Sequence, residues 1–288
     1  MTFSIYSVGG RLITTLDEWS LLAPPAGRAR QWKAGRSAQE LARRWVSGAL
    51  PGEVQHLLRS QAVFRGFVPL VAHAEHKTPI DSYRGNTRNH DLLVIGRTPN
   101  GPAVLDIEGK VDEPFGPTVA EQSRTARRAR ADNPRSRALE RLNEICWAVV
   151  GAPPETVGHL RYQLLHGVAA AAIAAAEREA RCAAWIVHEF RTPSADPAVL
   201  QRNARDLSAF IEHLNVPQRP VSRGTEASLV GPFRLPGGGR VPAGAELYIG
   251  KAVGTGSTIV GPDPAAETFD QMTRRYPVRR VADPDRPS

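Results

Sequence analysis

The sequence predicts an α/β or α+β domain built on one mixed sheet. First, the expected elements follow one another as helix, β-hairpin, helices, strand and helix, an order typical of such folds. Second, residues 105–112 alternate between apolar or small residues and charged ones, as a strand with two different faces does. Third, 288 residues with 41% hydrophobic and 23% charged side chains suit a globular protein with a sizeable core.

The chain opens with an N-terminal segment, residues 1–36, which precedes the core. Ser37-Ala38-Gln39-Glu40 has the pattern of a capping box and predicts a helix that carries Leu41 and Trp45 on one side. Pro51 and Gly52 end it. We expect next a short helix, an apolar stretch compatible with either a strand or a loop, and a polar loop (53–59, 64–76 and 81–89).

A β-hairpin is the central expectation. Residues 91–95 form a strand candidate, residues 98–102 (Thr-Pro-Asn-Gly-Pro) give a strong turn signal, and residues 104–111 form the returning strand. One face of this second strand is apolar or small, with Leu105, Ile107, Gly109 and Val111. The other face is charged, with Asp106, Glu108, Lys110 and Asp112. A charged row opposite a core face is costly unless it is solvated, paired or bound to something.

Helices are expected over 118–130, 136–150 and 159–180, followed by a buried strand over 182–190 and an amphipathic helix over 197–214. Two more strands, over 230–240 and 246–253, predict a C-terminal β-hairpin added to the sheet. We therefore divide the chain into a core (37–216), a β-rich extension of the same domain (217–264) and a flexible tail (265–288).

Charge and cysteine content narrow the class of protein. The net charge of +8 favours a polyanionic partner, although an arginine-rich genome would have the same effect. Cys146 and Cys182 lack zinc-site or disulfide spacing and are expected to be buried free thiols. The sequence shows neither a secretory signal nor an apolar run long enough to span a bilayer. We expect a cytoplasmic protein without membrane association.

The charged row predicts a catalytic site at the end of the sheet where the start of the first hairpin strand meets the end of the second. Asp91 begins one strand and Glu108 and Lys110 end its partner, so all three converge at one end of the sheet. Two carboxylates offer the hard oxygen ligands that Mg²⁺ prefers, with substrate phosphate in its remaining positions. Lys110 is one of four lysines among 37 basic residues, and lysine, unlike arginine, can titrate beside a nucleophilic water. This combination favours phosphodiester hydrolysis.

Asp91 followed by Glu108-Gly109-Lys110 at the end of a hairpin resembles the PD-(D/E)xK signature of the restriction-endonuclease-like nucleases. The resemblance covers about residues 37–214 and implies a restriction-endonuclease-like core, a mixed β-sheet flanked by helices. It implies that Asp91, Glu108 and the Gly109 carbonyl hold Mg²⁺ or its substitute Mn²⁺, and that Lys110 assists the attacking water. It also implies that Gln163, on the following helix, faces the site. The proline of the first motif is replaced here by His90.

Members of this superfamily often add an acid from an early helix. Glu40, Glu53 and Glu75 are the candidates, and we favour Glu75 as a further metal ligand because it is closest in sequence to the hairpin. A basic run follows the site, with seven arginines at positions 124, 127, 128, 130, 135, 137 and 141. Such a run is either a solvated helix face or a clamp on a phosphate backbone.

These observations favour a Mg²⁺-dependent nuclease that cleaves DNA, with RNA a weaker possibility. Homodimerisation is possible, because a duplex presents two strands. One alternative is a non-catalytic module of the same fold that binds nucleic acid or protein. Another is a metal-dependent hydrolase that acts on a different substrate.

Overall fold

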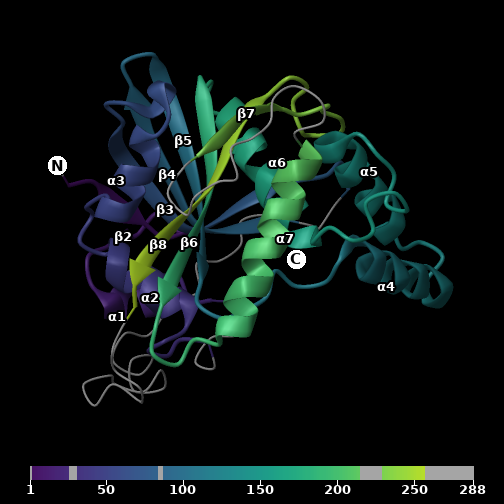
Figure 1. Ribbon diagram of the computed structural model, residues 1–288, viewed down its shortest axis with the longest axis horizontal. Helices are drawn as coiled ribbons and strands as arrows, with labels where there is room; N and C mark the ends of the chain where they lie inside the picture. The colour runs from purple at the N-terminus through teal and green to yellow at the C-terminus, as the bar shows by residue number, and fades with distance from the viewer. Residues whose placement is uncertain (1, 26–30, 84–86, 215–228, 257–288) are drawn as a thin grey trace, which may run out of the picture.

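The chain folds around one mixed sheet in the computed structural model, which describes residues 2–25, 31–83, 87–214 and 229–256 (Figure 1). The strand order is β2-β1-β3-β4-β5-β6-β8-β7. The strands are β1 (Ser4–Tyr6), β2 (Leu12–Ile13), β3 (Val68–Pro79), β4 (Thr87–Thr98), β5 (Gly101–Lys110), β6 (Cys182–Arg191), β7 (Val230–Arg234) and β8 (Glu246–Thr255). The predicted α/β class with a mixed sheet flanked by helices is therefore confirmed.

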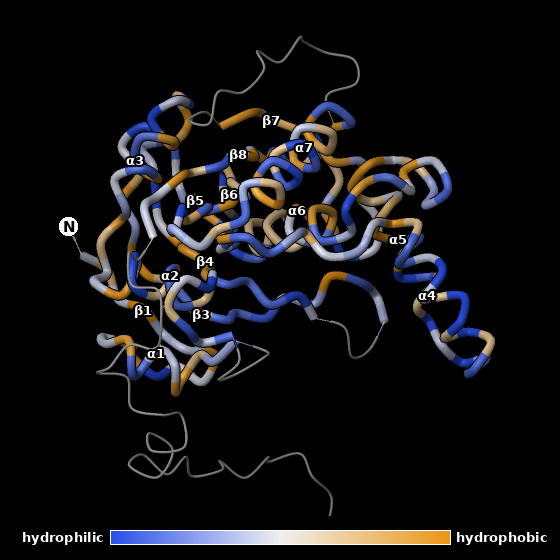
Figure 2. The backbone as a smooth tube through the Cα atoms, turned by 60° about the horizontal axis from the view of Figure 1, so that its bottom comes forward, coloured by the Kyte–Doolittle hydropathy of each residue, from blue (hydrophilic) through white to orange (hydrophobic). Residues whose placement is uncertain are grey.

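The helices cover both faces of this sheet (Figure 1). On one face lie α1 (Leu16–Leu22), α2 (Ser37–Trp45), α3 (Gly52–Arg59) and a short 3₁₀ turn (Ala62–Phe64). On the other lie α4 (Val119–Asp132), α5 (Ala138–Val150), α6 (Tyr162–Ala176) and α7 (Pro197–Leu214). Figure 2 shows α4 as a largely hydrophilic helix that projects from the end of the second layer.

The predicted hairpin is present and its register is regular. β4 pairs antiparallel with β5, and Leu93 lies opposite Asp106. β5 also pairs with β6, in parallel, and the helices α4, α5 and α6 form the connection between them. Parallel strands require such a crossover. The predicted C-terminal strands also pair with each other: β8 runs parallel to β6, and β7 lies antiparallel at the sheet edge.

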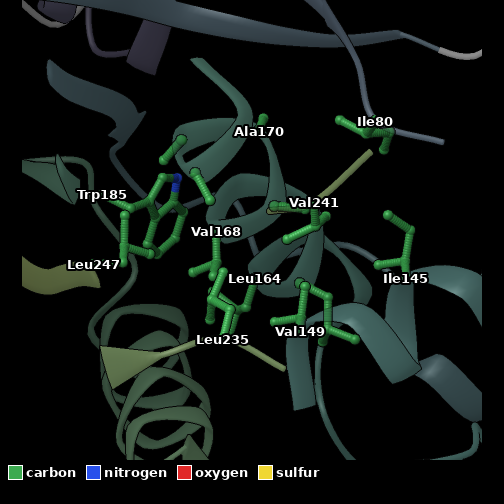
Figure 3. Close-up of a cluster of buried hydrophobic side chains, with 14 of the residues drawn as sticks. Ile80, Ile145, Val149, Leu164, Val168, Ala170, Trp185, Leu235, Val241 and Leu247 are labelled. Atoms are coloured by element: carbon green, nitrogen blue, oxygen red, sulfur yellow. The ribbon is translucent and has the colours of Figure 1, made fainter. Parts of the chain in front are cut away.

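Central strand β5 is buried on both faces, so its alternation separates two cores rather than a core from solvent. Val104 packs under α4 to α6, whereas Leu105 and Ile107 pack under α1 to α3. The alanine-rich α6 lies close to the sheet (Figure 3). Gly167 on α6 makes this approach possible, because a Cβ there would lie 2.3 Å from Nε1 of Trp185.

Several expectations need correction. Ser37 and Glu40 do not form a capping box: Arg36 is the N-cap residue, the Ser37 hydroxyl donates to Glu113 Oε1 (3.0 Å), and Glu40 accepts from the backbone of Gly35 (2.8 Å). The undecided stretch 64–76 mostly joins strand β3, and the expected loop 81–89 ends early because β4 begins at residue 87. The reason in each case is long-range pairing, which local propensity does not report.

The N-terminal segment contributes β1, β2 and α1, and it buries Ile5 and Trp19 in the same core as α2 and α3. Cys146 and Cys182 are buried free thiols, as expected. Every helix among the described residues is too short or too polar to span a bilayer. The proposed tail, 265–288, lies outside the described residues.

Candidate functional site

A cavity of about 480 Å³ opens beside the carboxyl end of β5. Its wall includes all six residues that the sequence nominates: Glu75, Asp91, Glu108, Gly109, Lys110 and Gln163. They come from β3, β4, β5 and α6, and residues of α1 and α2 form the opposite wall. The structure therefore brings together side chains that are up to 88 positions apart in the chain.

The hairpin register fixes the meeting of Asp91 and Gly109. The hairpin pairs Leu92 with Ile107, so Asp91 and the residues that follow Ile107 lie side by side. The backbone N–H of Gly109 donates to Asp91 Oδ2 at 2.8 Å. Gly109 faces α2: a Cβ at this position would be in close van der Waals contact, 3.4 Å from both Leu41 Cβ and the Ser37 carbonyl oxygen.

Glu108 is the centre of the polar network. Lys110 Nζ lies 2.9 Å from its Oε1 atom, and Gln163 Nε2 donates to the same oxygen at 2.6 Å. The second oxygen, Oε2, accepts from the guanidinium of Arg88. Lys110 also lies over the ring of Phe115, with Nζ 5.5 Å from the ring centroid. The lysine is thus held between a carboxylate and an aromatic face.

Glu75 lies in an unusual backbone conformation for a strand residue. Its φ of 53° is in the left-handed region, which costs a non-glycine residue about 1–3 kcal/mol. Regular pairs flank it on both sides, Ala74 with Leu92 and His76 with His90. Its Oε2 accepts from Asn89 Nδ2 at 3.4 Å, and its side chain lines the cavity. Backbone strain of this kind often accompanies functional sites.

The three carboxyl groups differ in how easily they ionise. Burial and the nearby Glu108 charge raise the pKa of Asp91. Burial and the charge of Asp91 raise the pKa of Glu75. Burial also opposes ionisation of Glu108, but Arg88 and Lys110 outweigh it and lower the pKa of that group. The site therefore holds one well-paired carboxylate and two that resist ionisation.

Further buried polar groups surround this network. Asp106 lies on the same face of β5 as Glu108, and its Oδ1 atom is 2.9 Å from Nδ1 of His90. His90, which stands at the proline position of the motif, also contacts Thr78 Oγ1 at 2.8 Å. Both Asp106 and His90 are fully buried, so they support the strands rather than line the cavity.

Sequence reasoning missed two contributors. Arg88 fell in the expected polar loop, and no motif marked it. Glu113 follows β5; its carboxylate accepts from the Ser37 hydroxyl (3.0 Å) and the Val111 N–H (3.0 Å), which ties the start of α2 to the site. Its only local signal was its position just after the charged strand.

The other acidic candidates have different partners. Glu53 accepts two hydrogen bonds from the guanidinium of Arg44, and its Oε1 atom lies 2.9 Å from His188 Nε2. Burial opposes its ionisation, but these partners hold the pKa of Glu53 well below its usual range. Glu40 accepts from the Gly35 backbone. Neither belongs to the cavity wall as the structure describes it.

The basic run lies on α4 and the start of α5. Some of its arginines form ion pairs, including Arg127 with Glu155 and Arg137 with Glu140. Most of the run is exposed: Arg124, Arg127, Arg128, Arg135 and Arg137. A capping box at the start of α4, in which Thr118 and Glu121 satisfy each other's backbone N–H groups, fixes the direction in which the helix leaves the sheet.

The donor set is chemically suitable for a magnesium ion. Among the residues that the structure describes, no three His, Cys, Asp or Glu side chains gather as a metal-holding group. Mg²⁺ does not require such a cage, since one or two carboxylates suffice when water and substrate phosphate fill the other positions. Asp91, Glu108 and the Gly109 carbonyl supply oxygen ligands of this kind, and the raised pKa of Asp91 marks a place where added positive charge is favourable.

Comparison with known proteins gives a family but no activity. Residues 12–255 match the family model described as a domain of unknown function, DUF6946. A search of curated proteins and a search of solved structures each found no match. The match begins in β2 and ends in β8, so it includes the whole cavity.

Proposed function

We propose that this chain, which belongs to the DUF6946 family, is a Mg²⁺-dependent nuclease of the PD-(D/E)xK type that hydrolyses phosphodiester bonds of DNA. The observation that carries the proposal is the convergence of Asp91, Glu108 and Lys110 on one cavity. A restriction-endonuclease-like core is part of the same proposal. The mixed sheet, with α2 on one side of the hairpin and α6 on the other, is consistent with it.

In this proposal Asp91, Glu108 and the Gly109 carbonyl hold the metal, and Glu75 adds a further carboxylate. Mg²⁺, when bound, supplies Lewis-acid polarisation of the phosphoryl oxygens. Water attacks phosphorus in line with the leaving oxygen of the sugar. Part of the charge that develops on the phosphoryl oxygens is offset by Lys110, whose ammonium group is already in place.

Lys110 orients the attacking water and stabilises the developing negative charge. Its ammonium group is fixed by Glu108 at 2.9 Å and by the ring of Phe115. Gln163 completes the arrangement by donating to the same Glu108 oxygen at 2.6 Å, which keeps that carboxylate in one orientation. Preorganised groups of this kind contribute more inside a cavity than they do in water.

DNA is the proposed substrate because of the charge on the protein as well as the site. The net charge of +8 and the exposed arginines of α4 suit a phosphate backbone. RNA remains the weaker alternative, and a homodimer is compatible with cleavage of two strands. Both belong to the proposal.

The direct test incubates the purified chain with supercoiled plasmid and linear duplex, in Mg²⁺, in Mn²⁺ and in EDTA. We expect metal-dependent cutting by the wild type and none by Glu108→Gln. Glu53→Gln is the matched control, because it alters a partly buried glutamate that also pairs with an arginine but lies outside the cavity wall. Cutting that persists in folded Glu108→Gln, or no cutting by the wild type of either DNA, would contradict the proposal.

A non-catalytic nucleic-acid-binding or protein-binding module is the second candidate. One observation favours it: both oxygens of Glu108 already have protein partners, which stabilises the site without a metal. Such a module would bind DNA with steep salt dependence and with the same affinity in Mg²⁺ and in EDTA. A filter-binding titration in both solutions separates the two candidates.

A further inference from the structure

A largely buried arginine contacts the carboxylate that the proposed metal site needs. Arg88 is the second residue of β4, and its guanidinium contacts Glu108 Oε2. The Arg88 side chain lines the same cavity as Lys110 and Gln163. Its Nε atom is buried without a hydrogen-bond partner in the described structure. A buried guanidinium donor that lacks an acceptor, beside a cavity, indicates a ligand with further oxygen atoms.

The contacts of Glu108 leave a divalent cation in competition with Arg88. Oε1 already has Lys110 and Gln163 as partners, and Oε2 has Arg88. A metal ion that binds Glu108 therefore approaches a carboxylate oxygen that already contacts a cationic side chain. Because like charges repel strongly at this separation in a buried site, the guanidinium must withdraw as the metal binds.

We infer that Arg88 is a phosphate-binding residue that rests on Glu108 in the metal-free protein and is released by the divalent cation. This inference depends on the proposed function. The released guanidinium binds non-bridging oxygens of the substrate phosphodiester across the cavity. The planar fork of arginine fits two phosphate oxygens at once, and such an acceptor would also satisfy Nε.

Two substitutions distinguish the effect of the positive charge of Arg88 from the effect of its planar guanidinium group. Arg88→Gln removes the competitor for Glu108, so Mn²⁺ should bind the free protein at least about fivefold more tightly, the lower end of typical coupling between linked sites. Arg88→Lys keeps the charge, so its affinity for Mn²⁺ should stay near that of the wild type. Both variants should lose affinity for inorganic phosphate in the Mn²⁺-loaded protein. Isothermal titration calorimetry measures both ligands.

Arg44→Gln is the matched control, because the guanidinium of Arg44 also donates to a glutamate, Glu53, but Arg44 lies outside the cavity wall. It should leave Mn²⁺ and phosphate binding unchanged. Thermal melting confirms that each variant is folded. A purely structural role for Arg88 predicts that Arg88→Gln weakens Mn²⁺ binding, so the sign of the change is decisive.

Three outcomes would overturn the inference: unchanged or weaker Mn²⁺ binding in folded Arg88→Gln, phosphate binding equal to that of the wild type in both variants, or no Mn²⁺ binding by any form. Tighter Mn²⁺ binding with weaker phosphate binding would support it, even if the wild type cuts no DNA. Cleavage of DNA by a wild type whose Arg88→Gln variant fails these tests would leave the nuclease standing and remove only the role of Arg88.

Discussion

Two glutamates of this protein, the partly buried Glu53 and the buried Glu108, each have cationic or hydrogen-bonding partners on two sides, and their surroundings differ. Around Glu53 the donors and acceptors match: Trp45 Nε1 lies 3.1 Å from His188 Nδ1, His188 Nε2 lies 2.9 Å from Glu53, and Arg44 satisfies the rest of the carboxylate. Around Glu108, two further carboxyl groups crowd the same cavity.

The difference separates a structural network from a site that is prepared for a ligand. Partners lower the pKa of both Glu53 and Glu108 against the effect of burial. Only the cavity also contains carboxyls whose pKa is raised, at Asp91 and Glu75. Ionising these two carboxyl groups inside the cavity destabilises the folded protein, and a bound cation would remove that destabilisation.

Lys110→Ala should reduce the rate of DNA cleavage by at least about a hundredfold, because it removes a preorganised charge from the reacting phosphate. Lys251→Ala is the control, since Lys251 also pairs with a buried glutamate, Glu189, at 3.2 Å but is not part of the cavity wall. Initial rates of plasmid nicking measure both. Full activity in Lys110→Ala would remove Lys110 from the proposed mechanism.

Glu53→Gln should lower the free energy of unfolding by about 2 kcal/mol, a typical cost for losing hydrogen bonds to a charged group. Arg44 and His188 lose their shared acceptor in this variant. Glu108→Gln should instead abolish Mn²⁺ binding. Urea denaturation and calorimetry on both variants give the comparison. Equal losses of metal binding in the two variants would show that the two networks do not differ as we describe.

Asp91→Asn should stabilise the metal-free protein at about pH 8 by on the order of 1 kcal/mol, since one unit of pKa shift corresponds to about 1.4 kcal/mol. The folded state raises the pKa of Asp91, so it binds the proton more tightly than the unfolded chain does. Stability from this group is present near pH 4 and is lost as the pH rises through the raised value. Asparagine cannot ionise, so the Asp91→Asn variant does not lose this stability as the pH rises.

Thermal melts of wild type and Asp91→Asn at about pH 5 and about pH 8 measure this effect. The gap between the two proteins should widen towards the higher pH. A gap that is constant with pH would mean that Asp91 ionises as an ordinary carboxyl group does. Glu75 adds to the same trend, because its pKa is raised in part by the Asp91 charge that the variant lacks, whereas the lowered pKa of Glu108 affects stability only at acid pH.

Replacing Arg124 and Arg128 together by glutamine should weaken DNA binding modestly and equally for all sequences. Each lost phosphate contact should reduce the slope of log affinity against log salt by about 0.9. Arg234→Gln is the control, because Arg234 is an exposed arginine on edge strand β7. Fluorescence anisotropy over a range of salt concentrations measures the slopes. An unchanged slope would mean that α4 does not contact the DNA backbone.

Local patterns were sufficient to predict much of the fold. Turn residues at 98–102 and the period-two alternation of β5 predicted the hairpin, and the helix over 197–214 has the bounds that its amphipathic pattern indicated. Local patterns failed where long-range contacts compete with them. Ser37 and Glu40 have the sequence of a capping box, yet Glu113, 76 positions from Ser37, takes the serine hydroxyl.

In the candidate site, too, some residues could be predicted from local patterns and others depend on long-range packing. Asp91, Glu108, Gly109 and Lys110 were predictable because hairpin geometry is short-range, and a period of two places Glu108 and Lys110 on one face. The backbone strain at Glu75 and the arrival of Gln163 from α6 depend on how distant segments pack.

Sequence patterns were enough for the mixed α/β class, which follows from the order of the expected elements. They were also enough for the hairpin and the acidic row with its lysine, because these follow from turn chemistry and side-chain alternation within about 20 residues. Tertiary structure alone decided that Arg88 rests on Glu108, and that Glu53 belongs to a closed network while Glu75 belongs to the cavity. The physical reason is that the pKa and partners of a buried charge depend on every group packed around it, and those groups come from distant parts of the chain.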